Sequence, residues 1–425
     1  MDRSDLWRPA PLAWALYDFA YSLFSFLLLV RFFPTWIIDD QGHPDWYVAI
    51  TQVVVVLVVV FAMPLAGAMA DQLGRRKPFL AAFTVASCMS AAALSFVPED
   101  PVVLVLLIAG VSAASGQLAL AQYDPILADV APPEARGRVS GLAVALGFAG
   151  IIVGLGVVAE LIVGEGDKQR AFAPAAAFYL ALALPAFLLI HERTHRRAAP
   201  GHLFRTGLLQ LAESARQARR YPRVSRFLLG RFLYSDAIAT LSVFLTVYMS
   251  RLGGFSEREK NVVLGLVVVG AAAGAVAAGR LIERVGPRRL LLSVLPVVSL
   301  SIALSALVGE PWPVWVMGPV AGVGLGVVWT TDRVFMLILT PAELRGQFFG
   351  FFNLANRVAS AVGPLVVWSG TVWMLHQLTG WTTRLDASRV ALAELAIVAL
   401  VGWAVIRPLP DERRAEERAV AAAVA

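Results

Sequence analysis

Twelve long apolar runs constrain the fold of this chain more than any other feature. A membrane-spanning helix needs roughly 17 to 25 apolar residues. The runs cover residues 11–37, 46–70, 77–97, 101–128, 138–163, 171–190, 226–250, 260–282, 289–308, 313–339, 345–374 and 388–406. Strands of a membrane barrel would alternate in polarity, and these runs do not. Because 58% of the residues are hydrophobic and only 16% are charged, the sequence predicts an all-α membrane protein.

Two copies of a short polar motif divide the chain into similar halves. The first contains Gly67, Asp71, Gly74, Arg75, Arg76 and Lys77, and the second, 212 residues later, contains Gly279, Glu283, Arg284, Gly286, Arg288 and Arg289. A further pair, Glu134 and Arg136, recurs as Glu343 and Arg345 after 209 residues. We therefore expect two pseudo-symmetric bundles of six helices, an arrangement found in transporters that are built from structural repeats.

The distribution of lysine and arginine predicts the orientation in the membrane. With the N-terminus inside, and with residues at the run ends counted with the adjoining segments, 24 of the 36 basic residues fall in cytoplasmic segments, 7 in external loops and 5 in the interior of the runs. This arrangement satisfies the positive-inside rule with both termini cytoplasmic. The expected domains are an N-terminal bundle (1–190), a basic cytoplasmic linker (191–225), a C-terminal bundle (226–407) and a cytoplasmic tail (408–425). Either an interfacial helix or a solvated segment fits the linker.

Composition also restricts the partners and cofactors. Cys88 is the only cysteine, which excludes an internal disulfide and a cysteine metal cluster, and we expect it in the core of the run 77–97. The net charge of +6 follows from the topology and favours contact with anionic lipids, not nucleic acid. The first run lacks a signal-peptide cleavage site and reads as a retained helix. We expect a monomer without a cofactor or resident metal.

The first polar motif, spaced G-x-x-x-D-x-x-G-R-R-K, resembles the signature loop of the major facilitator superfamily. The position of its second copy, the twelve runs and the long central connection match that family as well. A narrower resemblance, to the branch that contains the vacuolar amino-acid effluxers of fungi and their bacterial relatives, rests on Trp14 to Ala20, Pro132 to Arg138 and Arg231 to Asp236. The resemblance implies a multi-pass secondary transporter of the bacterial inner membrane that moves a small-molecule substrate by alternating access.

Charged residues inside the runs indicate a polar cavity. They are Asp18, Arg31, Asp124, Glu160, Arg231, Asp236, Arg280, Asp332, Arg333, Arg357 and Glu394. Each costs roughly 2.5 to 3.5 kcal/mol at the centre of a membrane helix, so most must face water, an opposite charge or a helix end. The family resemblance implies that the first, fourth, seventh and tenth runs surround a central cavity. Eight of the eleven charges lie on these four runs and the eleventh.

Asp236 is the leading candidate for a site that couples transport to protons. It lies ten residues into the run 226–250, about 15 Å deep at a rise of about 1.5 Å per residue, and burial disfavours the charged form of a carboxylate. Asp18 is its counterpart in the first half. The complete candidate cavity consists of Tyr17, Asp18, Ser22, Tyr123, Asp124, Tyr234, Asp236, Trp329, Asp332, Arg333, Asn353, Asn356 and Arg357. Structural ion pairs among Arg231, Asp236 and Arg357 are the alternative.

The duplicated motifs form a candidate cytoplasmic gate. The resemblance implies that Asp71 faces the amino end of the eleventh helix and Glu283 that of the fifth, where an anion is favourable, and that this network latches the outward-open state. The candidate gate residues are Gly67, Asp71, Gly74, Arg75, Arg76, Lys77, Glu134, Arg136, Glu283, Arg284, Gly286, Arg288, Arg289, Glu343 and Arg345. A purely topological role for the basic residues is the alternative.

Three hypotheses about the activity remain open. Acidic, basic and aromatic residues in the candidate cavity suit a zwitterion such as an amino acid or short peptide, which the chain would export with proton coupling. A multidrug or sugar-type proton-coupled transporter is the alternative, although the Gly-Pro element that drug antiporters carry in the fifth helix occurs here in the eleventh, at Gly363 and Pro364. A membrane metalloprotease is the third hypothesis, because His191, Glu192 and His195 form an H-E-x-x-H string. Arg196 and Arg197 oppose a bound cation there, and we do not expect an enzyme.

Overall fold

The structure, a computed structural model, describes residues 8–98, 101–132, 135–192, 221–340, 345–380 and 382–410. These ranges are helices joined by short connections, and they contain no strand. Twelve of the described helical segments are long and apolar enough to cross a membrane. The prediction of an all-α protein with twelve membrane-spanning helices is confirmed.

The chain divides into two compact units. Unit 1 comprises Met1–Gln210, Val243–Ser250 and Gly254–Gly265. Its main helices are α1 (Pro9–Phe26), α3 (Trp46–Leu73), α4 (Lys77–Leu94), α5 (Val102–Val130), α6 (Arg136–Val153) and α7 (Phe172–Leu189). Short segments η2 (Leu27–Phe32), α2 (Phe33–Thr35) and η3 (Trp36–Asp40) extend α1, η4 (Gly154–Val163) extends α6, and η5 (Lys168–Ala171) precedes α7.

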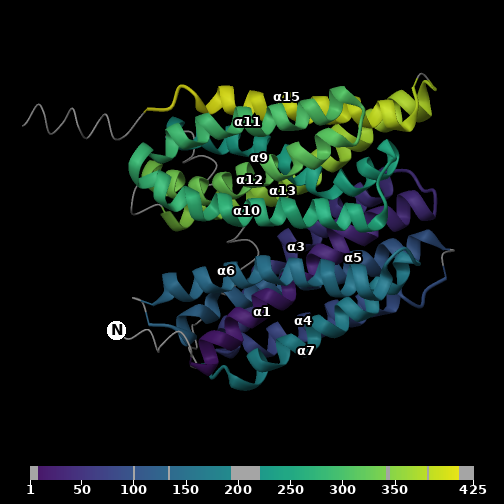
Figure 1. Ribbon diagram of the computed structural model, residues 1–425. Coiled ribbons are helices and arrows are strands. Elements are labelled where there is room, and N and C mark those ends of the chain that lie inside the picture. Colours follow the sequence, from purple (N-terminus) through teal and green to yellow (C-terminus); the bar gives the residue numbers. More distant parts are fainter. Residues whose placement is uncertain are drawn as a thin grey trace, which may run out of the picture. The chain divides into compact units, whose positions relative to one another are not determined.

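Unit 2 comprises Leu211–Ser242, Arg251–Gly253 and Leu266–Ala425. Its helices are α9 (Pro222–Leu252), α10 (Glu257–Val285), α11 (Pro287–Val308), α12 (Trp312–Leu339), α13 (Arg345–Val362) and α15 (Arg384–Ile406), with η7 (Gly363–Ser369), α14 (Gly370–Val372) and η8 (Trp373–Leu378) extending α13. The carboxyl end of α9 and the amino end of α10 belong to unit 1, although most of both helices belongs to unit 2. Figure 1 shows α11 and α15 side by side.

Three membrane helices change from α to π geometry along their length, at η2, η4 and η7. Proline explains part of this change, because it has no N–H to donate to the carbonyl four residues earlier. Pro34 leaves the carbonyl of Val30 without its usual donor, and the hydroxyl of Thr246 donates to that oxygen at 3.1 Å. Pro364 lies in the first turn of η7. Polar groups therefore reach backbone atoms inside the bundle where the α pattern ends.

Glycines allow two pairs of helices to approach until their backbones touch. A Cβ atom at Gly150 would overlap the carbonyl of Phe19, so α6 lies directly against α1. A Cβ atom at Gly274 would overlap the carbonyl of Val323, and one at Gly326 that of Ala271, so α10 lies directly against α12. Small residues in membrane helices commonly permit such packing. Close packing of this kind fixes the helices that carry the candidate site.

Candidate functional site

Asp236 lies near the middle of α9 and contacts the point where α13 becomes η7. Its side chain is buried, with a relative exposure of 3%, and its Oδ1 accepts a hydrogen bond of 2.6 Å from the backbone N–H of Gly363. Thr240, one turn further along α9, donates its hydroxyl to the carbonyl of Asp236 at 2.7 Å. A Cβ atom at Gly363 would lie 2.6 Å and 2.7 Å from the two carboxylate oxygens and would overlap the Thr240 hydroxyl. Glycine is therefore what lets the carboxylate reach the helix backbone.

A second aspartate in unit 2, Asp332, has charged and hydroxyl partners instead. Its Oδ2 lies 2.9 Å from Nε of Arg231, and its Oδ1 accepts a hydrogen bond of 2.6 Å from the hydroxyl of Tyr234. Arg231 also donates to the carbonyl of Phe352 at 3.0 Å and stacks over the Phe352 ring at 3.5 Å. This triad of Arg231, Tyr234 and Asp332 is buried and links α9, α12 and α13. Arg231 thus pairs with Asp332, which differs from the alternative interpretation of the sequence, ion pairs among Arg231, Asp236 and Arg357.

The remaining candidates of unit 2 lie at less buried positions. Trp329 has a relative exposure of 47%, Arg333 and Asn356 are exposed, and Arg357 is half-buried. The side chain of Asn353 lies outside the described residues. The structure therefore brings Tyr234 and Asp332 together in one contact and places Asp236 in another, with the other candidates distributed around them on α12 and α13.

In unit 1, Asp18 and Ser22 face Gly147 across the packed pair of helices α1 and α6. A Cβ atom at Gly147 would lie 3.0 Å from Oδ2 of Asp18 and 2.9 Å from Oγ of Ser22. Asp124 is exposed on α5. Each half therefore contains an aspartate packed against a glycine: Asp18 lies against Gly147 of α6, and Asp236 lies against Gly363, which follows α13.

Tyr17 and Tyr123 belong to an aromatic cluster in unit 1. The Tyr17 hydroxyl lies 2.7 Å from the hydroxyl of Thr84 and 2.6 Å from that of Tyr179. Tyr123 donates to the carbonyl of Trp14 at 2.8 Å and stacks on both Trp14 and Tyr17. Both tyrosines are buried, and their contacts join α1 to α4, α5 and α7.

The first signature loop is held by the end of α7. The carboxylate of Glu192 accepts hydrogen bonds from the backbone N–H groups of Arg76 and Lys77, the latter at 3.0 Å, and Lys77 Nζ donates to the carbonyl of Ile190 at 2.6 Å. An anion at the amino end of a helix is favourable, so Glu192 caps α4. This contact gives the central glutamate of the H-E-x-x-H string a structural role, and no metal-binding group of three or more His, Cys, Asp or Glu occurs among the described residues.

Other gate candidates also hold backbone atoms. Gly74 and Gly286 adopt φ values of 70° and 88°, a region that favours glycine. Arg136 donates to the carbonyl of Ala131 at 3.2 Å at the end of α5, and Arg288 donates to that of Arg407 at 2.5 Å. Gly67 is half-buried, and Arg75, Arg284 and Arg289 are exposed.

Several predicted features lie outside the described residues. They are Glu134, His195, Glu343, the linker residues 193–220 and the tail residues 411–425. The side chains of Asp71, Glu283 and Arg345 are likewise not described, although their backbones belong to α3, α10 and α13. The contacts that the resemblance implies for Asp71 and Glu283 therefore remain predictions.

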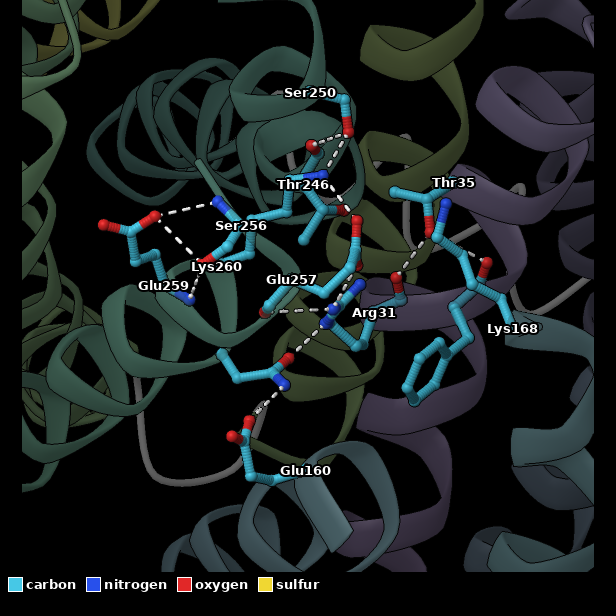
Figure 2. A network of polar contacts seen from close by, with 12 residues as sticks. Arg31, Thr35, Glu160, Lys168, Thr246, Ser250, Ser256, Glu257, Glu259 and Lys260 are labelled. Carbon is cyan, nitrogen blue, oxygen red and sulfur yellow. Dashed lines mark hydrogen bonds and ion pairs between the residues drawn. The ribbon is translucent and has the colours of Figure 1, made fainter. Parts of the chain in front are cut away.

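A polar network around η2, the segment that extends α1, was not predicted from the sequence. Arg31, in η2, is fully buried and donates to Oε2 of Glu257 at 2.6 Å and to Oδ1 of Asn261 at 2.5 Å. Asn261 also donates to Glu160 of η4 at 3.3 Å. Figure 2 shows Arg31 pointing toward Glu257 at the start of α10, with Glu160 in the lower part of the view. We call Arg31, Glu160, Glu257, Lys260 and Asn261 the distal network.

The distal network joins residues that are far apart in the sequence. Lys260 extends it by contacting Oε1 of Glu257 and the hydroxyl of Ser250, both at 2.8 Å. All these residues belong to unit 1, because the ends of α9 and α10 are part of that unit. The available signal was the charge of Arg31 inside an apolar run. Its partner Glu257 lies outside the predicted run 260–282, so the pair could not be identified from the sequence.

Comparisons with known proteins agree on one family. A model described as Major Facilitator Superfamily matches residues 19–364. The uncharacterized MFS-type transporter YxiO of Bacillus subtilis (strain 168) is 25% identical over 417 residues, which cover 94% of each chain. The class E tetracycline resistance protein of Escherichia coli is 25% identical over 334 residues, 75% of this chain and 78% of that protein. The crystal structure of the nucleoside transporter NupG matches the fold with a TM-score of 0.74 at 15% identity, covering 94% of this chain and 99% of that one.

Proposed function

The chain belongs to the major facilitator superfamily, a family of multi-pass membrane transporters, and from this we propose that it is a proton-coupled secondary transporter of the bacterial inner membrane. It would move a small solute by alternating access, opening first to one side of the membrane and then to the other. We further propose that it carries out no catalytic reaction, and that both termini lie in the cytoplasm.

The observation that supports alternating access best is the distal network. Arg31 and Glu160 come from the first half of the sequence, and Glu257 and Asn261 come from the second. A buried charge is costly without its partner, so this end of the bundle is stable only while the ends of α9 and α10 stay against η2 and η4. Breaking a few polar contacts would release them, as a two-state transporter requires. We propose that the distal network closes the external side.

Asp236 is the carboxylate best suited to carry the coupled proton. Within the described part of the chain it accepts a hydrogen bond from a backbone N–H and has no ion pair with a basic side chain. Asp332 has Arg231 as a permanent counter-charge and is suited to a structural role. A carboxylate that is buried without a counter-charge can be neutralised by binding a proton, so Asp236 can change its charge during a transport cycle.

For the substrate we propose an amino acid or a short peptide, exported from the cell. The acidic, basic and aromatic residues among the sequence-predicted candidates suit the two ends of a zwitterion, and in unit 1 the side chains of Asp18 and Ser22 lie together against Gly147. A multidrug exporter is the second candidate, because the similarity to a tetracycline resistance protein extends over most of both chains. A sugar-type substrate has no specific observation in its favour.

The substrate class can be tested by thermal unfolding of the purified protein against a panel of amino acids, dipeptides, sugars, organic acids and lipophilic cations. A ligand at about 100 times its dissociation constant adds roughly 2.7 kcal/mol of stability. Selective stabilisation by amino acids or dipeptides is the expected result. Stabilisation by lipophilic cations alone would replace this proposal with the drug-exporter alternative.

Coupling can be tested with the stabilising ligand in proteoliposomes. With an imposed pH gradient, the wild-type protein should accumulate the ligand, whereas Asp236→Asn should exchange it across the membrane without accumulating it. Glu165→Gln removes an exposed carboxylate from a connecting segment and should behave as the wild type. Undiminished gradient-driven accumulation by Asp236→Asn would exclude Asp236 as the proton carrier.

A further inference from the structure

Three arginines gather where the amino end of α11 meets the carboxyl end of α15. Arg288 and Arg289 lie in the first turn of α11, which begins at Pro287, and Arg407 follows the last residue of α15. Arg288 Nη2 donates to the backbone carbonyl of Arg407 at 2.5 Å, and Trp403 Nε1 donates to the carbonyl of Leu292 at 2.9 Å. These bonds hold the two helix ends together. We call Arg288, Arg289 and Arg407 the arginine cluster.

Arg288 has a side-chain N–H that could bind an anion. Nε of Arg288 is buried and has no hydrogen-bond partner among the described residues. The guanidinium of Arg407 lies 5.4 Å from the centre of the Trp403 ring, and the Arg407 and Arg289 side chains are exposed. An orphaned donor inside a group of positive charges costs free energy, and an anionic acceptor would remove that cost.

The first half of the chain contains an anion at the equivalent position. Arg76 and Lys77, 212 residues before Arg288 and Arg289, bind the carboxylate of Glu192 through their backbone N–H groups at the start of α4. The start of α11 has the same pattern of two basic residues after a glycine of positive φ, but its N-cap residue Gly286 provides no side-chain hydrogen bond. The amino end of α11 thus has the donors of the first repeat, and Arg407 adds a further positive charge.

From these observations we infer that the arginine cluster binds a phosphate group, which a membrane phospholipid supplies. Arginine forks match phosphate geometry and helix amino ends favour phosphate oxygens. Both α11 and α15 are membrane-spanning segments, so their ends lie at the level of lipid headgroups, where tryptophan such as Trp403 is commonly found. Basic sites between membrane helices are suited to anionic headgroups. A lipid with two phosphates, such as cardiolipin, would match Arg288 and Arg407 best.

The inference can be tested by measuring lipid affinity of the full chain with native mass spectrometry, using cardiolipin, phosphatidylglycerol, phosphatidylcholine and inorganic phosphate as separate probes. Cardiolipin should bind most tightly. The double variant Arg288→Gln and Arg407→Gln should weaken cardiolipin binding about 25-fold, or about fivefold for each arginine at roughly 1 kcal/mol. Glutamine keeps a donor for the Arg407 carbonyl, and unfolding temperatures measured without lipid will show whether the variants are folded.

Arg223→Gln is the matched control, because Arg223 is an exposed arginine at the start of α9 in the same unit. Arg223→Gln should change cardiolipin affinity by less than about twofold. If it weakened binding as much as the double variant, the lipid would be held by general electrostatic attraction to the protein, and the proposed site would be wrong. Equal binding of inorganic phosphate would overturn the lipid as source. A large gain in affinity for Asp411→Asn with Glu412→Gln would mean that the tail already supplies the anion, which would also overturn the inference.

Discussion

The carboxylate of Asp236 accepts a hydrogen bond of 2.6 Å from the backbone N–H of Gly363, 127 residues away in the sequence. The bond lies where α13 changes to the π geometry of η7, because at such a change a backbone N–H can be free of its usual carbonyl partner. The carboxylate of Asp236 thereby contacts the backbone at the point where the α-helical pattern ends. Glycine at position 363 leaves room for the carboxylate of Asp236, and this carboxylate accepts the hydrogen bond of the Gly363 N–H.

Gly363→Ala should destabilise the protein by about 1 to 3 kcal/mol, the usual cost of overpacking a core. The added Cβ atom would overlap the Thr240 hydroxyl and lie 2.6 Å from Oδ2 of Asp236, so the buried carboxylate would have to move. Gly265→Ala is the control, since its Cβ atom would meet nothing within 4 Å and alanine is the better helix former. Thermal unfolding in detergent measures both; equal stability of the two variants would contradict the described contact.

Breaking the Arg231–Asp332 pair should be costly. Arg231→Gln leaves Asp332, with a relative exposure of 1%, without its counter-charge, and removal of one partner of a buried pair typically costs about 3 to 5 kcal/mol. The ion pair of Arg258 with the half-buried Glu160 provides the comparison. The side chain of Arg258 is 77% exposed, so Arg258→Gln should cost less than about 1 kcal/mol.

The same pair should show coupling in a double-mutant cycle. Arg231→Gln combined with Asp332→Asn removes both charges, so its destabilisation should be smaller than the sum of the two single changes. Additive losses would mean that the two side chains do not interact in the membrane-embedded protein, and that the triad with Tyr234 is misassigned.

Glu192→Ala should destabilise unit 1 by about 1 to 2 kcal/mol, because it removes the acceptor for two N–H groups at the start of α4 and an anion from its positive end. Glu192→Gln retains an acceptor oxygen and should cost less. Added zinc should stabilise neither the variants nor the wild type, because the carboxylate is engaged by Arg76 and Lys77. Zinc-dependent stabilisation that disappears in Glu192→Ala would revive the metal-binding hypothesis for the H-E-x-x-H string.

The sequence predicted the twelve membrane helices because each is long, apolar and bounded by charged or turn residues. It also placed Cys88 correctly in the core. The change to π geometry at Leu27, Gly154 and Gly363 could not be predicted, since a run that is apolar on every face has no periodic signal to mark a change of helical pitch.

Charged residues inside the helices were recognisable from their cost in lipid, but their partners were not. The alternative interpretation of the sequence was ion pairs among Arg231, Asp236 and Arg357, whereas the structure pairs Arg231 with Asp332 of α12. The sequence shows Arg31 as a charge inside an apolar run but does not indicate its partner, because Glu257 lies 226 residues later near a loop. Pairings across such distances depend on helix packing, which hydropathy does not encode.

The most direct test of alternating access is a distance measurement across the distal network. In a Cys88→Ser background, spin labels at positions 165 and 262 report the separation of the η4–η5 connection and α10, since Glu165 and Val262 are both exposed. We predict one short distance in the wild type, and a second, longer population that grows in Asn261→Ala, in Glu257→Gln and with the stabilising ligand. A single distance that none of these changes alters would contradict the proposal that this end of the protein opens and closes.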